Sequence, residues 1–143
     1  MLRSVVNTLI FLLGLVPFVY ASAAPNKAED YMREAEYYQK KADNYRSEAE
    51  YYQKKANSYE SEQQYYIKKA QNYQNEAAYY SKKGDVDRSR TYSRYASDAM
   101  DNAQTQARYA KDALDNYKMY MNWAKEADEK AAMYLHWAQR ALD

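Results

Sequence analysis

Tyrosine is the residue type whose number and spacing in this chain are most suggestive of chemistry. The sequence has 19 tyrosines beside only two phenylalanines. One set of tyrosines recurs at every fourteenth position, and a Lys-Lys pair follows each member by three and four positions. This set, the outer tyrosine row, is Tyr37, Tyr51, Tyr65 and Tyr79. Phenols that are exposed outside a cell can be oxidised and coupled, and nearby amines can react or displace surface ions. The row is therefore a candidate for association or cross-linking.

Other kinds of chemical site have little support in the sequence. The chain has no cysteine, which excludes disulfides, a thiol nucleophile and cysteine metal ligands. Its one histidine, His136, lies between two apolar residues, and no second histidine exists to complete a metal site. Carboxylates such as Glu34 and Glu48 recur with the repeat and do not form a unique pair for acid–base work. We therefore predict no enzyme activity, no cofactor and no metal.

Residues 1–24 have the features of a signal peptide. Arg3 supplies the positive charge, residues 5–20 are mostly apolar, and small residues follow at 21–24. The apolar run is shorter than the roughly 20 residues of a typical membrane span. We expect cleavage of residues 1–24, secretion (to the periplasm in a bacterium), and no stable membrane span after the signal is removed. An uncleaved anchor is the alternative.

The remaining charges are balanced. Loss of Arg3 leaves equal numbers of basic and acidic residues. A chain without net charge gives no electrostatic reason to expect nucleic acid as a partner. It also lacks the charge repulsion that keeps protein molecules apart, so self-association becomes easier.

Residues 25–84 consist of a 14-residue repeat built from two heptads. Alanine recurs at every seventh position from Ala28 to Ala77, with Gln63 as the one exception, and tyrosine recurs at every seventh position from Tyr31 to Tyr80. The two series alternate at spacings of three and four, as the a and d positions of a coiled coil do. The candidate seam tyrosines are Tyr38, Tyr45, Tyr52, Tyr59, Tyr66 and Tyr73. The outer tyrosine row falls on c positions, where it either faces solvent or covers a second helix contact.

Residues 85–143 carry a second alanine series. It runs from Ala96 to Ala138 at intervals of seven, with Tyr117 in one place. Apolar residues flank the series on both sides. One flank includes Met100, Leu114, Met121 and Leu135, and the other includes Tyr95, Tyr109, Trp123 and Trp137. An apolar face of this width predicts contact with more than one neighbour.

The two heptad regions meet at Gly84, the only glycine or proline after position 25. Glycine suits the left-handed conformation that ends many helices, and Asp85 or Asp87 is suited to cap the next helix. Two helices of nearly equal length with a short connection pack side by side in opposite directions. The sequence therefore predicts an all-α protein, with helices over 25–84 and 85–143 in an antiparallel hairpin or coiled coil.

The export signal, the tyrosine-rich heptads and the paired lysines together resemble secreted coiled-coil structural proteins of the silk and byssal-thread type. That resemblance implies assembly into an extracellular fibre, cement or matrix. The leading hypothesis is a secreted structural or adhesive protein whose partner is itself or another helical protein. The alternative is an extracellular or periplasmic helical binding module for a partner protein or an apolar ligand.

Overall fold

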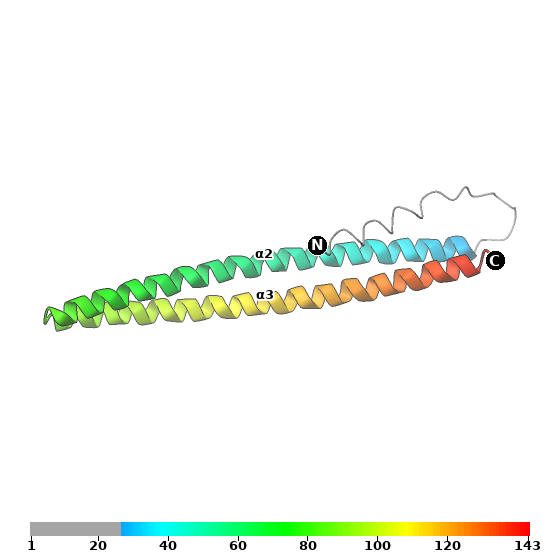
Figure 1. Ribbon diagram of the computed structural model, residues 1–143. Helices are drawn as coiled ribbons and strands as arrows, with labels where there is room; N and C mark the ends of the chain where they lie inside the picture. Colours follow the sequence, from blue (N-terminus) through cyan, green and yellow to red (C-terminus); the bar gives the residue numbers. More distant parts are fainter. Residues whose placement is uncertain (1–26) are drawn as a thin grey trace.

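The computed structural model describes residues 27–143, which form two long helices and no strand. Helix α2 spans Lys27–Lys82 and helix α3 spans Val86–Arg140. They lie side by side in opposite directions, so that the end of α3 comes back beside the start of α2 (Figure 1). The prediction of an antiparallel helical hairpin with its turn near Gly84 is confirmed. The predicted signal peptide, residues 1–24, lies outside the described residues.

The turn is a C-terminal helix cap built around Gly84. This glycine has a φ of 76°, a conformation that side chains with a Cβ disfavour. The N–H of Asp85 donates to the carbonyl of Tyr80 at 3.0 Å, and the N–H of Gly84 donates to the carbonyl of Ser81 at 3.0 Å. These two bonds define the Schellman motif, which satisfies carbonyls that the end of a helix leaves open. The reversal of the chain is therefore specified locally.

Helix α3 begins immediately after this cap. The side chain of Asp85 accepts a hydrogen bond from the N–H of Arg88 at 3.0 Å, so Asp85 is the N-cap residue. One turn further on, the Ser89 hydroxyl donates to the carbonyl of Ala77 in α2 at 2.9 Å. This bond between the helices fixes their alignment where they first meet.

The core between the two helices is made of alanine. Every buried hydrophobic residue in the described chain is an alanine, and none is more than 8 % exposed. In α2 all of them belong to the heptad series from Ala28 to Ala77. In α3 they include the series from Ala96 to Ala138 and a second set, Ala99, Ala113 and Ala127. Since an alanine side chain ends at Cβ, the two backbones approach closely, and larger side chains are displaced to the edges of the contact.

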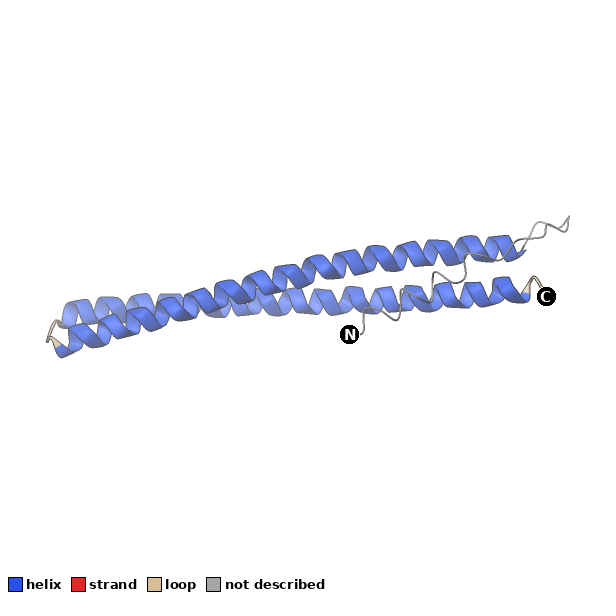
Figure 2. Cartoon of the chain, turned by 45° about the horizontal axis from the view of Figure 1, so that its top comes forward, coloured by secondary structure: helices blue, strands red, loops and turns tan. Residues whose placement is uncertain are grey.

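The two helices wind around each other along the hairpin (Figure 2). A sustained heptad repeat of apolar residues requires this, because a heptad falls slightly short of two turns of a straight α-helix. The winding keeps the two alanine series in contact over the whole length.

One flank of the α3 alanine series stays near the surface. Met100, Met121 and Leu135 are each 38–39 % exposed, because α2 is the only neighbour of α3 in the described residues. In the same row Asp128 forms an ion pair with Arg46 of α2. This half-exposed pair adds little stability, since solvent screens the attraction. We refer to Met100, Met121 and Leu135 as the methionine edge.

Candidate functional site

The tyrosines of α2 meet aromatic residues of α3 in separate clusters along one side of the hairpin. In each complete cluster an α3 tyrosine stacks on an α2 tyrosine, with ring centroids 5.5–5.6 Å apart and planes within 5–17° of parallel. A second α3 aromatic ring tilts against the other α2 tyrosine at 5.5–5.7 Å. The end cluster is Tyr31, Tyr38, Tyr134 and Trp137. The middle cluster is Tyr45, Tyr52, Tyr120 and Trp123. The turn cluster is Tyr73, Tyr80, Tyr92 and Tyr95.

A fourth level, between the middle and turn clusters, is incomplete. Tyr59 contacts Tyr109 at 5.4 Å, but Gln106 stands where the other levels have the stacking tyrosine. The side-chain oxygen of Gln106 is buried and has no hydrogen-bond partner. Gln63, the exception in the α2 alanine series, is nearly the same distance along the chain from the turn. This level therefore packs less well than the other three.

Three hollows lie between successive levels of aromatic residues. Each has a small α3 side chain at its floor, and we name the hollows after these residues, Ala127, Ala113 and Ala99. Their volumes are about 230, 130 and 150 Å³ respectively. The lining residues of the three sites recur at every second heptad in both helices, so the hollows are copies of one site.

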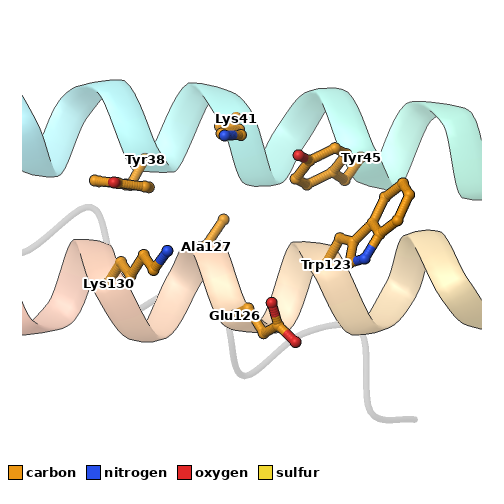
Figure 3. Close-up of a pocket in the computed structure, with 7 residues that line it drawn as sticks. All are labelled: Tyr38, Lys41, Tyr45, Trp123, Glu126, Ala127 and Lys130. Carbon is orange, nitrogen blue, oxygen red and sulfur yellow. The ribbon is translucent and has the colours of Figure 1, made fainter.

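The Ala127 hollow shows the chemistry of the repeated site (Figure 3). The rings of Tyr38 and Tyr45 extend from α2 on either side of Ala127. Trp123 of α3 packs against Tyr45, with ring centroids 5.5 Å apart. One ammonium group from each helix and a carboxylate from α3 complete the lining. The six larger lining residues are Tyr38, Lys41, Tyr45, Trp123, Glu126 and Lys130.

The other two hollows repeat this lining with small changes. The position of Trp123 is taken by a tyrosine, that of Glu126 by an aspartate, and that of Lys130 by an asparagine. Lys130 differs in that its Nζ lies 5.4 Å from the ring centroid of Tyr38. Every hollow is lined by three aromatic residues, a lysine of α2 and a carboxylate of α3.

The outer tyrosine row lies next to the hollows. Its four rings are between 52 % and 58 % exposed. Each ring packs edge-on against the following tyrosine in the chain, with centroids 5.2 Å apart. A lysine one helical turn further on holds its Nζ 5.4–5.8 Å from the centre of each ring. These lysines are Lys41, Lys55, Lys69 and Lys83. The first three also line the hollows, so the row and the hollows share one face of the hairpin.

The candidate seam tyrosines border the hollows instead of filling the centre of the contact. All six are partly exposed, and alanines occupy the buried centre. Five of the six, all except Tyr66, touch an aromatic ring of α3. Tyr66 instead packs against Tyr65 and lines the Ala99 hollow.

Two tyrosines of α3 have perturbed acidity. Burial raises the pKa of Tyr120 and of Tyr134, because a phenolate is poorly solvated between the helices. The neighbouring tyrosines Tyr52 and Tyr38 add to these increases. These phenols therefore keep their protons more firmly than an exposed tyrosine does, which makes them poorly suited to act as nucleophiles.

The remaining ionisable residues form no candidate metal-binding group in the described part of the chain. His136 is exposed on α3. Residues 27–143 contain no set of three or more side chains that could hold a metal ion. Neither of the two helices is long and apolar enough to cross a membrane.

Sequence reasoning identified the outer tyrosine row and the tyrosines of α2, but not the hollows. The signal was present: Ala99, Ala113 and Ala127 recur at every second heptad, and Tyr92, Tyr120 and Tyr134 fall between or beside them on the same series.

Comparison with known proteins adds no relative, since no family model, no curated protein and no solved structure matches the chain.

Proposed function

We propose that this protein is a secreted structural or adhesive building block, a helical rod that associates with copies of itself to form an extracellular fibre or matrix. The observation that carries the proposal is the outer tyrosine row. Four half-exposed phenol rings are held on one face at intervals of about 21 Å along the helix. A row of exposed rings with a regular spacing is suited to contact a partner that has the same spacing, which supports the proposal.

The composition of the core supports the same function. An alanine core buries little apolar surface, so the fold leaves most of its large aromatic side chains at the edges, where a neighbouring molecule can reach them. The helix lengths of 56 and 55 residues make a rod of roughly 80 Å. A long rod with a repeated contact surface gains affinity from many weak contacts made together.

Cross-linking is a second use of the outer row in this proposal. An external one-electron oxidant would remove an electron and a proton from each of two phenols, whose rings then couple. The half-exposed rings of Tyr37, Tyr51, Tyr65 and Tyr79 are accessible to such an oxidant. Tyr120 and Tyr134, with raised pKa values and half-buried rings, are less accessible.

The alternative function, a binding module, has its support in the three hollows. Each combines aromatic walls with at least one ammonium group and a carboxylate. Ligand pockets in proteins usually have volumes of about 300–1,000 Å³. The hollows, at about 130–230 Å³, are smaller than this. They suit a single ring or side chain better than a whole small-molecule ligand, which favours a protein partner.

The size of the purified chain, measured against its concentration by sedimentation velocity, separates the two functions. Self-assembly predicts species whose size increases with protein concentration. Replacement of all four tyrosines of the outer row by alanine should abolish this increase. A size that stays fixed across the concentration range would refute the structural proposal and leave the binding module.

A further inference from the structure

We propose that the three hollows are the docking sites for the outer tyrosine row of a second copy of this chain. The inference rests on the proposed self-association and names its two complementary surfaces. One copy donates rings from its outer row, and the other accepts them between the aromatic levels at Ala127, Ala113 and Ala99.

The hollows, which open to the surface, are similar in volume to a cavity that holds a single aromatic ring. An apolar cavity of about 150 Å³ is large enough to hold benzene. The hollows measure about 230, 130 and 150 Å³ and have aromatic walls, against which an entering ring can stack or pack edge-on. A tyrosine also needs a partner for its hydroxyl, and each hollow has a carboxylate at its rim.

The two surfaces have the same period. Neighbouring hollows are two heptads apart, and so are neighbouring outer tyrosines, which is about 21 Å for both. Three rings therefore enter three hollows without any change in either helix. A partner with another spacing would fill one hollow and miss the next, so the period selects this chain itself.

Each hollow offers a carboxylate to the incoming row, beside a lysine ammonium in its own lining. The rim carboxylates Glu126, Asp112 and Asp98 take part in none of the ion pairs found among residues 27–143. Each incoming tyrosine hydroxyl can donate a hydrogen bond to such a carboxylate. Each incoming tyrosine is also accompanied by a lysine of its own helix, whose ammonium lies 5.4–5.8 Å from the centre of the tyrosine ring. This positive charge meets the carboxylate that accepts the hydroxyl.

This contact joins the outer row of one copy to the hollows of another. A reciprocal contact, in which each copy inserts its row into the other's hollows, closes a pair. A one-way contact is heterologous and continues into an open-ended filament unless its rotation closes a ring. The fibre proposed above requires the one-way contact.

The experiment uses two variants of the whole chain that each keep one surface. The donor-deficient variant carries Tyr37→Ala, Tyr51→Ala, Tyr65→Ala and Tyr79→Ala. The acceptor-deficient variant carries Ala99→Met, Ala113→Met and Ala127→Met, which fill the hollows with a flexible side chain. The matched control carries Met100→Ala, Met121→Ala and Leu135→Ala on the methionine edge. Helix content and melting temperature are recorded for all of them.

We expect the control to assemble like the parent chain and each deficient variant alone to stay monomeric. A mixture of the two deficient variants should form a complex of one chain of each, because each supplies the surface that the other lacks. If the methionine substitutions disturb the hairpin, a gentler variant replaces them, with Asp98→Asn, Asp112→Asn and Glu126→Gln at the exposed rims. It should raise the concentration for half-assembly at least tenfold, roughly the factor for one lost hydrogen bond to a charged group.

The outcomes separate this inference from the proposed function. If the parent chain stays monomeric at all concentrations, self-association fails and the inference fails with it. Suppose instead that removal of the outer row abolishes assembly while filled or neutralised hollows assemble normally. Self-association then stands, but the hollows are not the docking sites and the rings meet some other surface. Absence of a mixed complex from two folded deficient variants would likewise overturn the inference.

Discussion

Helices α2 and α3 are nearly equal in length and share an alanine series at the same heptad position, but their second series differ. In α2 the second series is tyrosine at every heptad. In α3 tyrosine or Gln106 alternates with alanine, so that the pattern repeats only at every second heptad. Helix α2 thus has a ring in this series at every heptad, whereas α3 has one at every second heptad at most, since Gln106 takes the place of one ring. Aromatic clusters form where both have rings, and hollows form where α3 has alanine.

The comparison shows how a simple repeat produces a patterned surface. Two helices with a strict heptad repeat would give an even seam with no preferred position for a partner. Doubling the period of one helix creates sites about 21 Å apart without adding a loop or an insertion. The outer tyrosine row has the same doubled period, although it belongs to α2. Both surfaces of the proposed contact therefore come from one two-heptad unit.

We expect the largest change in the free energy of unfolding when an α3 ring is removed from a complete cluster. Tyr120 stacks on Tyr52 at 5.5 Å and also contacts Tyr45 and Trp123. Loss of a buried aromatic side chain costs about 3–5 kcal/mol, and we expect Tyr120→Ala to cost about 3 because the ring is only half-buried. Chemical denaturation measures the free energy of unfolding. Met121→Ala, next in the chain and on the methionine edge, is the matched control and should cost much less.

A loss below about 1 kcal/mol for Tyr120→Ala, within the range of ordinary substitutions, would contradict this account. It would mean that the alanine contacts alone hold the helices together and that the aromatic clusters add little to the stability of the rod.

The incomplete level gives the converse prediction, in which α3 is made more like α2. Gln106→Tyr should place a stacking ring beside Tyr59 and Tyr66 and remove a buried oxygen that has no partner. An aromatic pair adds about 0.5–1.5 kcal/mol beyond its buried area, and an unsatisfied buried polar group costs about 1–3 kcal/mol. We expect a net gain of about 1 kcal/mol in unfolding free energy, the lower part of the range for these two effects. Gln104→Tyr, at a nearby exposed position, is the control and should give no such gain.

A decrease in stability for Gln106→Tyr in a chain that keeps its helix content would show that this level is closed to a ring. The levels would then differ in backbone spacing and not only in side chain.

Much of the fold could be predicted from the sequence because its signals are local. Gly84 is the only glycine or proline after position 25, and the two alanine series begin at defined distances from it. The inner face of α3 was harder to predict. Met100, Met121 and Leu135 are more hydrophobic than Ala99, Ala113 and Ala127, so hydropathy favours the wrong flank of the alanine series. In the structure the alanines are buried and the larger residues stay partly exposed, because close approach of two backbones selects small side chains.

The hollows could not be predicted for a related reason. A hollow arises from a mismatch between two helices that are far apart in sequence, and heptad analysis treats each helix alone. The outer tyrosine row was different. Its position on the heptad placed Tyr37, Tyr51, Tyr65 and Tyr79 outside the seam, but left open whether they were covered. Within the hairpin they are half-exposed.

A smaller effect should appear at alkaline pH. The pKa values of Tyr120 and Tyr134 are raised in the folded state, mainly by burial, whereas an unfolded tyrosine ionises at about pH 10. Their contribution to stability is therefore complete below about pH 10 and is lost as the pH rises through their folded pKa values. Ultraviolet titration of the phenolates should show a late-ionising fraction. The double substitution Tyr120→Phe and Tyr134→Phe should remove that fraction, whereas Tyr51→Phe and Tyr65→Phe should leave it in place.

The smallest effect on folding is expected in the outer row itself. Tyr51 is 54 % exposed, and its ring packs against Tyr52 and lies under the Lys55 ammonium, both in its own helix. Tyr51→Ala should therefore change the unfolding free energy by no more than about 0.5 kcal/mol, as surface substitutions usually do. Its neighbour Tyr52 differs, since it stacks on Tyr120 of α3, and Tyr52→Ala should cost several times more. The comparison between these adjacent residues is made by denaturation of the two variants at a protein concentration low enough for sedimentation to show single chains. Equal losses would mean that the outer ring supports the hairpin from within, and the case for a row reserved for association would fail.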